Sequence, residues 1–237
     1  MRQESHGQEV SITHAGIVGF WSSDRGLTLV TISIIIQIFV ITPLGEAGIP
    51  LRILCDVIVA GLLIARALSV HRTRVFTGVL IVSVVATAIG LTAGRMHPTV
   101  PVRVLGSALV ALTLSLYIHV VLVVMLRGGP MNLGRIQGGV CAYLLLGMAW
   151  ASMYQLVEQL QPGSFRFVTA PLGIDQLTSK MVYFSFGTLT TVGSEISALT
   201  PFARSLATAE AVVGQLFPSV FIGALVTLAM HARPSNN

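Results

Sequence analysis

Six long apolar stretches divide the chain, and most polar residues fall in the connections between them. A helix needs about 20 apolar residues to cross the hydrocarbon core of a bilayer. The stretches are uniformly apolar rather than alternating, which disfavours a β-barrel, and lipid otherwise permits only helices. The pattern therefore predicts an all-α membrane protein. The six predicted spans are Leu27–Leu44, Leu51–Val70, Val75–Ala93, Pro101–Leu126, Ile136–Leu160 and Arg204–Met230.

The composition supports this prediction. Hydrophobic residues make up 54% of the chain and charged residues only 10%, whereas a soluble domain carries about 25% charged residues. So few charges cannot coat a water-facing surface, which argues against a large soluble protein. The formal net charge is +5, but the arginines lie between the apolar runs. Membrane topology explains them better than binding to nucleic acid, and no nucleic-acid partner is expected.

The connection between the fifth and sixth predicted spans differs from the others. This connection, Gln161–Ala203, is long, and it contains a semi-apolar run, Met181–Val192, that is too short to cross a membrane. Such a run predicts a re-entrant segment, which is tolerated at membrane depth only where it faces protein or a watery cavity. The modest bias of arginines places both termini in the cytoplasm. The re-entrant segment then enters from the extracytoplasmic face.

The re-entrant segment contains residues suited to binding a dehydrated cation. Met181–Thr190 can form a short helix, and the negative end of its dipole favours a cation beyond its C-terminus. Thr191-Val192-Gly193 follows, offering a hydroxyl and backbone carbonyls, and the glycine permits backbone angles closed to other residues. Four copies around one axis would present rings of oxygen that replace the hydration shell of an ion.

At this point the sequence resembles a known family. Tyr183–Gly193 is similar to the pore helix and selectivity filter of potassium channels, which read TTVGYGD, and the strong part of the likeness covers Arg135–Leu228. The nearest resemblance is to bacterial six-helix ion channels with a two-helix-type pore domain. The resemblance implies a homotetramer in the bacterial inner membrane that conducts monovalent cations passively. Further matching residues are Arg135–Gly138, Tyr143–Gly147, Ile196 and Thr200–Ala207.

The chain departs from the family pattern within the filter. Where potassium channels have glycine-tyrosine-glycine-aspartate, this chain has Gly193-Ser194-Glu195. Serine is too small to brace the filter as the tyrosine does, and the second glycine is missing. The filter therefore resembles the short filters of nonselective channels such as the cyclic-nucleotide-gated type. It implies a cation channel with weakened selectivity for potassium over sodium.

These considerations assign a role to each segment. The segments are an N-terminal cytoplasmic stretch (1–26), a four-helix membrane domain (27–126), a linker (127–135), a pore domain (136–230) and a C-terminal tail (231–237). The assigned residues are Thr191, Val192, Gly193, Ser194 and Glu195 in the ion filter; Tyr183, Phe184, Thr188 and Thr190 in the pore helix; and Gly214 and Pro218 as a gating hinge. Permeant K⁺ or Na⁺ would bind at Thr191, Val192 and Gly193, and no other metal or cofactor is expected. Glycine and proline are also common in membrane helices generally, which leaves the hinge assignment open.

The fourth predicted span lacks the arginine ladder of a voltage sensor. Arg103 is followed at third-residue spacing by Gly106, Leu109 and Leu112, so steep voltage gating is not expected. Among the polar residues inside the predicted spans, Asp56, His119 and Glu210 are candidates for a functional role. Each is either a hydrogen-bonded or ion-paired structural residue or a functional one, and the sequence does not decide between these.

Two other classes of membrane protein remain as alternatives. A nonconducting or regulatory channel-like subunit would have the same pattern. A secondary transporter is less well supported, because transporters show internal repeats and paired broken helices, and this chain has one re-entrant segment. No H-E-x-x-H, G-x-S-x-G or phosphate-binding glycine loop occurs, so no enzymatic activity is expected.

Overall fold

A computed structural model describes residues 24–46, 61, 74–96, 99–126 and 133–231. Its elements are α2 (Asp24–Ile36), the π-helical segment η1 (Gln37–Ile41), α3 (Thr42–Glu46), α5 (Arg74–Met96), α6 (Val100–Leu126), α7 (Leu133–Leu160), β1 (Phe165–Arg166), α8 (Ile174–Leu189), β2 (Ser197–Ala198) and α9 (Pro201–His231). The regular secondary structure of the described residues is therefore helical apart from one pair of two-residue strands, and loops join α7 to α8 and α8 to α9.

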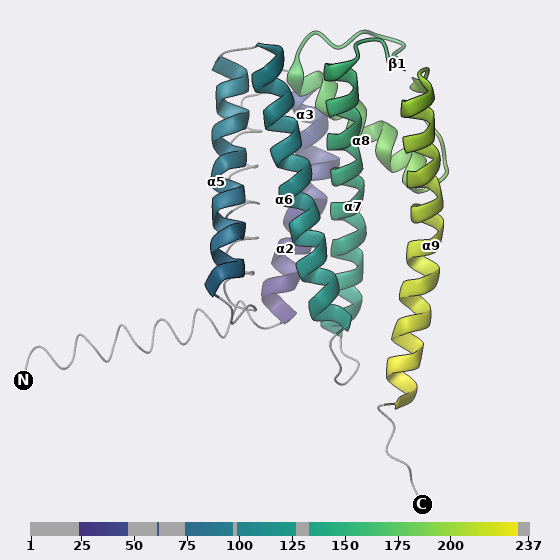
Figure 1. The fold of residues 1–237 in the computed structure, drawn as a ribbon. Helices are drawn as coiled ribbons and strands as arrows, with labels where there is room; N and C mark the ends of the chain where they lie inside the picture. Colours follow the sequence, from purple (N-terminus) through teal and green to yellow (C-terminus); the bar gives the residue numbers. More distant parts are fainter. Residues whose placement is uncertain (1–23, 47–60, 62–73, 97–98, 127–132, 232–237) are drawn as a thin grey trace, which may run out of the picture.

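Most of the helices stand side by side, and α8 is the exception (Figure 1). α5, α6 and α7 form a row, α2 lies behind α6 and α7, and α9 stands at the far side from α5. α8 is tilted, and it passes from the upper end of the molecule toward the middle of α9. Helices α7 and α9 both contact α8, as does the short helix α3. α8 is therefore contacted by elements from both the N-terminal and the C-terminal parts of the described chain.

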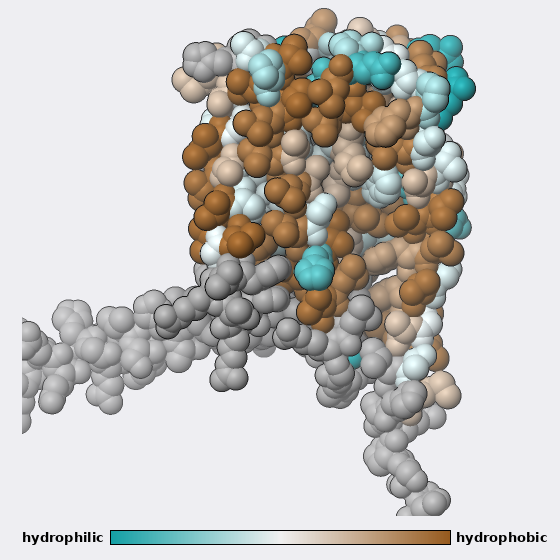
Figure 2. Space-filling view, viewed as in Figure 1, coloured by the Kyte–Doolittle hydropathy of each residue, from teal (hydrophilic) through white to brown (hydrophobic). Residues whose placement is uncertain are grey.

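Three helices of the described chain are long and apolar enough to cross a membrane. These spans are Val100–Val123, Gly134–Leu160 and Pro201–Thr227, and shorter apolar helices cover Thr28–Leu44 and Gly78–Gly94. Hydrophobic side chains dominate the face seen in Figure 2, and hydrophilic ones gather toward its upper end. The predicted span Leu51–Val70 and its Asp56 lie outside the described residues, except for Gly61. The helical, apolar character predicted from the sequence is confirmed, whereas the number of six spans stays a prediction.

Several predicted boundaries were wrong. The helix predicted at Met181–Thr190 begins at Ile174 and ends at Leu189, so Thr190 follows the helix. α7 begins at Leu133, inside the predicted 127–135 linker, and α2 begins at Asp24, inside the predicted N-terminal stretch. α9 extends to His231, the first residue of the predicted tail.

The start of α9 has a clear chemical cause. The helix begins at Pro201 instead of Arg204, and Thr200 precedes it as the N-cap. The Thr200 hydroxyl accepts a hydrogen bond from the Ala203 N–H at 3.3 Å. Threonine is a favoured N-cap, and proline is favoured at the first helical position because its missing N–H would have no partner there.

Close contacts join the helices into one packed unit. Gly90 of α5 and Gly106 of α6 lie backbone to backbone, because a Cβ on Gly106 would lie 3.2 Å from the Gly90 oxygen. Ser107 of α6 and Gln159 of α7 are hydrogen-bonded at 3.1 Å. Near the other end of α7, the Thr28 hydroxyl of α2 donates to the Gln137 side chain at 3.1 Å.

The two strands connect the segments before and after α8. β1 pairs antiparallel with β2, with Phe165 opposite Ala198 and Arg166 opposite Ser197. The Glu158 carboxylate at the end of α7 accepts the N–H groups of Gly163 and Phe165 at 2.9 and 3.0 Å. The segment between α7 and α9 is thereby closed into a loop at the upper end of the molecule, where β1 is labelled in Figure 1.

Candidate functional site

The inserted helix α8 has clear start signals. Gly173 precedes it in an extended conformation, and Asp175 lies in its first turn, where a negative charge is favourable beside the positive end of the helix dipole. The side chain of Gln176 reaches back and accepts the Leu172 N–H at 2.8 Å. This is the geometry by which a third-position side chain satisfies a donor before the helix.

The chain reverses direction immediately after α8. Thr190 still donates its N–H to Phe186 O at 3.1 Å, and Thr191 donates to Thr188 O at 3.0 Å. Thr191 then adopts a φ of 59°, and Gly193 a φ of 87°. A left-handed conformation is uncommon for threonine and is found where surrounding contacts enforce it.

Two hydrogen bonds fix the segment that follows the reversal. The Gly193 N–H donates to Gly187 O at 2.9 Å, so residues 191–193 run back along the last turns of α8. From the other side, the Gln215 amide of α9 donates to the Thr191 hydroxyl at 3.0 Å. The segment is therefore held between α8 and α9, while Val192 itself is 85% exposed in the single chain.

The end of α8 is also held from α7. The Tyr143 hydroxyl donates to Leu189 O at 3.3 Å, and Leu189 is fully buried. Gly187 has no room for a side chain, because a Cβ there would lie 2.5 Å from Gly193 O. The last turns of α8 and the returning chain are thus in close contact.

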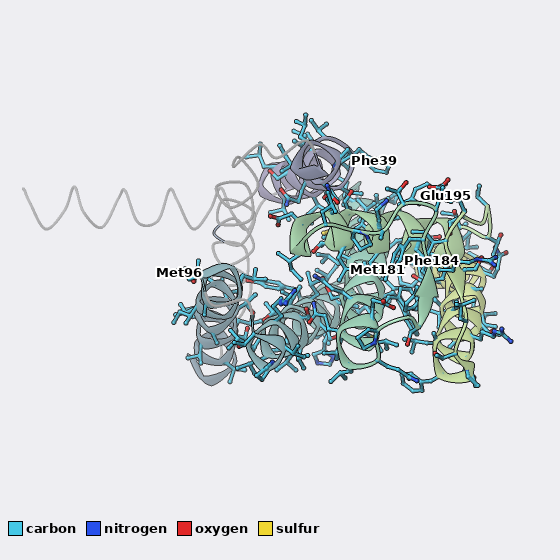
Figure 3. All side chains as sticks on the ribbon, turned by 90° about the horizontal axis from the view of Figure 1, so that it is seen from above. Phe39, Met96, Met181, Phe184 and Glu195 are labelled. Carbon is cyan, nitrogen blue, oxygen red and sulfur yellow. The ribbon has the colours of Figure 1, made fainter. Side chains whose placement is uncertain are left out.

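Ser194 and Glu195 lead the chain out of this turn. The Ser194 hydroxyl bonds to the backbone of Ile196, accepting its N–H at 3.3 Å and lying 3.1 Å from its carbonyl oxygen. Ile196 is buried, whereas Glu195 is exposed. From above, Glu195 lies on the opposite side of the molecule from Met96, which marks α5 (Figure 3). A negative charge is thus placed beside the returning segment, on the side of the molecule that lies away from Met96.

An aromatic cluster supports the back of α8. Phe184 of α8, Tyr154 of α7 and Phe165 of β1 pack edge to face, with ring centroids 4.9 to 5.6 Å apart. Such pairs stabilise by about 0.5–1.5 kcal/mol beyond the area that they bury. Met181 and Phe184 lie inside the packed part of the molecule in Figure 3, and both are buried. By contrast, Tyr183 is 53% exposed.

The structure brings most of the predicted site residues together. Thr191 to Glu195 form one continuous turn at the end of α8, and Gly214 of α9 lies against Leu189 O. The Thr188 and Thr190 hydroxyls bond to the α8 carbonyls of Phe184 and Phe186, at 2.9 and 2.6 Å. Pro218 lies farther along α9, which continues as a helix through it.

Of the residues that contact this region, Tyr154 and Gln215 were not singled out from the sequence, and Tyr143 and Ser185 were included only within stretches that resemble the family. The amide of Gln215 in a long apolar helix was a usable signal, because an isolated polar group in such a helix needs a partner. The described residues contain no cluster of three or more His, Cys, Asp or Glu side chains that could hold a metal ion. Hydroxyl and backbone oxygens are the groups that this site offers to a cation.

Comparison with known families finds one match. Residues 140–231 match the family model described as an ion channel, of the two-transmembrane type. This stretch contains most of α7 and all of α8, the turn at 190–196 and α9. No curated protein and no solved structure matches the chain. The part of the chain that resembles ion channels is therefore the part that forms the site.

Proposed function

We propose that the protein is a passive cation channel in which four copies surround an axis and Thr191–Glu195 form the filter. One observation carries this proposal: a short inserted helix ends at a turn that is bonded to both α8 and α9 and that remains exposed in the single chain. A turn that is held on two sides while residues 191–193 stay exposed fits a site that must bind ions and release them. The similarity of residues 140–231 to ion channels supports the same function.

The need for several copies follows from the geometry of one chain. A single turn cannot enclose an axis, so the filter requires closed rotational symmetry, for which we propose four chains. Only 11% of the α9 span is buried within the chain, against 61% of the α7 span. In the proposed tetramer, α9 faces the pore and neighbouring copies, and lipid covers the outer helices.

The preference for cations follows from the charges around the turn. The C-terminal end of α8 directs its dipole negatively toward residues 190–193. Glu195 adds one exposed carboxylate per chain. With the short filter TVGSE in place of TVGYGD, the expected permeant ions are K⁺ and Na⁺ with little discrimination between them. We place the channel in the bacterial inner membrane with both termini in the cytoplasm.

Purified protein in planar bilayers tests the proposal. A channel gives discrete unitary currents that reverse near the equilibrium potential of the permeant cation in a salt gradient. A Thr191→Ala variant should change the reversal potential under mixed K⁺ and Na⁺, whereas Thr92→Ala on α5 should not. Saturable flux without unitary currents would indicate a transporter, and the absence of both from well-assembled protein would indicate a nonconducting subunit.

A further inference from the structure

Glu210 is a carboxyl group buried in the middle of the helical contacts behind the turn. It lies in α9 and is 0% exposed. Its Oε2 lies 2.5 Å from the Tyr154 hydroxyl of α7, and its Oε1 lies 2.5 Å from the Ser185 hydroxyl of α8. Ser185 Oγ in turn lies 2.7 Å from Gly147 O of α7. One side chain therefore links α7, α8 and α9.

Such a group requires an explanation, because burying a carboxyl group is unfavourable unless its oxygens are fully bonded. Its contacts in the described chain are the two hydroxyls of Tyr154 and Ser185, which do not neutralise a charge. Among the described residues no ion pair is formed with Glu210, and the nearby Arg204 donates its Nε–H to Ala198 O at 3.2 Å. A leucine would fill the same space without the free-energy cost of burying two polar atoms.

The number of hydrogen atoms available to the oxygens of Tyr154, Glu210, Ser185 and Gly147 indicates the protonation state of Glu210. Three contacts lie in sequence: Tyr154 to Oε2, Oε1 to Ser185, and Ser185 to Gly147 O. Each contact needs one hydrogen, and the two hydroxyls supply only two. The third hydrogen belongs on Glu210 Oε1. Tyr154 then donates to Glu210, Glu210 donates to Ser185, and Ser185 donates to the Gly147 carbonyl.

The contacts of Glu210 continue in register toward the turn. Ser185 contacts Glu210, and one helical turn farther along both helices Leu189 contacts Gly214. Immediately beyond, Thr191 accepts the hydrogen bond of Gln215. Residues four apart lie on the same face of a helix. The Glu210 contact therefore fixes the register in which α9 approaches the turn.

From this geometry we propose that Glu210 is a positioning residue for the filter. As a neutral acid it holds α8 and α9 in the register that brings Gln215 to Thr191. Loss of its hydrogen bonds frees α8 to shift against α9, and the Thr191 hydroxyl then loses its fixed direction. This inference rests on the proposed channel function, since it predicts a change in how ions are conducted.

Three substitutions separate hydrogen bonding from packing. Glu210→Gln keeps an oxygen that accepts a hydrogen bond from Tyr154 and an N–H that donates one to Ser185. The K⁺/Na⁺ permeability ratio and the unitary conductance of this variant should therefore stay within about twofold of wild type. Glu210→Leu keeps the volume but loses both bonds, and one of these quantities should change about fivefold, as expected for one net hydrogen bond. Ser185→Ala should change in the same direction as Glu210→Leu. Ser152→Ala is the matched control, because the Ser152 hydroxyl bonds only to Met148 O of its own helix.

The proton on Glu210 can be observed independently of conduction. The infrared difference spectrum between wild type and Glu210→Gln should contain the C=O stretch of a protonated carboxyl group that is shielded from solvent. Its absence would overturn the neutral-acid assignment, as would a Glu210→Gln channel that behaves like Glu210→Leu.

The conduction results distinguish the two proposals. If wild type conducts and an assembled Glu210→Leu channel keeps the wild-type permeability ratio and conductance, the positioning role is wrong and the channel function stands. If wild type, assembled and reconstituted, gives no unitary currents, the channel function fails and the positioning role fails with it. An effect of Ser152→Ala as large as that of Ser185→Ala would also contradict the positioning role.

Discussion

Gly214 of α9 lies directly against the carbonyl oxygen of Leu189, the last residue of α8, so closely that a Cβ on Gly214 would overlap that oxygen. α9 remains a continuous helix at this position. The glycine is therefore required by the close approach of two backbones. A hinge role for Gly214 and Pro218 remains a prediction, and it has to be tested against this packing role.

Substitution of Gly214 by alanine tests the close approach. Gly214→Ala should force α9 away from the end of α8 and destabilise the protein by about 1–3 kcal/mol, the usual range for an overpacked contact. Thermal unfolding in detergent measures this loss. Gly223→Ala on the same helix is the control, because nothing lies within 4 Å of its Cβ position. Alanine there should be neutral or stabilise by up to about 1 kcal/mol.

The two glycines also separate packing from hinge motion. If Gly214→Ala is as stable as wild type but opens with altered kinetics, the hinge interpretation is favoured over the packing interpretation. If both alanine variants destabilise equally, the effect belongs to α9 as a whole and not to its contact with Leu189.

The bond between Gln215 and Thr191 gives a second prediction. Gln215→Leu removes the donor to the Thr191 hydroxyl, so the hydroxyl oxygen should become mobile. The K⁺/Na⁺ permeability ratio should then move about fivefold toward unity. If the wild-type ratio is already near unity, the ratio of the variant should stay near unity. Conductance noise should increase because the oxygen no longer has a fixed direction. Bi-ionic reversal potentials and single-channel recordings measure the two effects.

A double-mutant cycle makes the second prediction specific. Thr191→Val and Gln215→Leu remove the two ends of one bond, so their effects should not add in the double variant. Thr208→Ala serves as the control, because its hydroxyl bonds to Arg204 O within α9. Additive effects of Thr191→Val and Gln215→Leu would mean that the two residues act independently.

The sequence was sufficient to locate the turn after α8 but not to bound the helix. Thr191–Gly193 stood out because a hydroxyl and a glycine end a semi-apolar run that is too short to cross a membrane, and because the stretch resembles a channel filter. The first turns of α8 were missed because Asp175, Gln176 and Lys180 made that stretch too polar to count as membrane-inserted. The extended Gly173 and the Gln176 side chain nevertheless start a helix there. Hydropathy was thus the wrong criterion for a helix that is partly covered by protein.

The contacts that hold the turn could not be predicted in the same way. Glu210 and Ser185 are 25 residues apart, and Gln215 and Thr191 are 24 apart. Which residues meet depends on how α8 crosses α9, and no local pattern specifies that crossing. The contact of Phe39 from the first helix with Phe186 of α8, at 6.3 Å between ring centroids, depends on tertiary packing as well.

The third prediction concerns membrane potential. Arg103 is half-buried in α6 beside Gly94 of α5, and the positions that follow at third-residue spacing are uncharged. Steep voltage dependence requires several moving charges per subunit, so open probability should change little with voltage. Arg103→Gln should leave the slope unchanged. A steep activation curve in wild type, equivalent to several gating charges per subunit, would contradict this prediction, and so would a slope that changes in Arg103→Gln.

Glu195 leads to a fourth prediction, on ionic strength. In the proposed tetramer, four exposed Glu195 carboxylates near the pore mouth should concentrate cations, so Glu195→Gln should lower unitary conductance several-fold at about 0.01 M salt, where the Debye length is roughly 30 Å. At about 1 M salt the Debye length is roughly 3 Å and the difference should nearly vanish. Arg166→Gln is the control, because it removes a positive charge instead of a negative one from an exposed residue of β1. It should not lower the unitary conductance at low salt. A loss in Glu195→Gln that is independent of salt would instead indicate direct ion coordination by the carboxylate.

The last prediction concerns selectivity, because the proposed filter departs from the potassium-channel pattern at Gly193-Ser194-Glu195. Gly193 is bonded to Gly187 and Ser194 to Ile196, so only two residues connect the fixed Gly193 to the buried Ile196. Fewer coordinating groups leave fewer positions at which potassium and sodium can be distinguished. Replacing Ser194-Glu195 by tyrosine-glycine-aspartate lengthens this connection and adds a carbonyl ring and an aromatic brace. Bi-ionic reversal potentials should then show a K⁺/Na⁺ permeability ratio higher by about tenfold or more, which corresponds to about 1.4 kcal/mol of added discrimination. Insertion of one glycine after Ser194 controls for length alone and should give little gain. If wild type already prefers potassium strongly, the short connection is not the limiting feature, and Ser194 and Glu195 complete the filter by themselves.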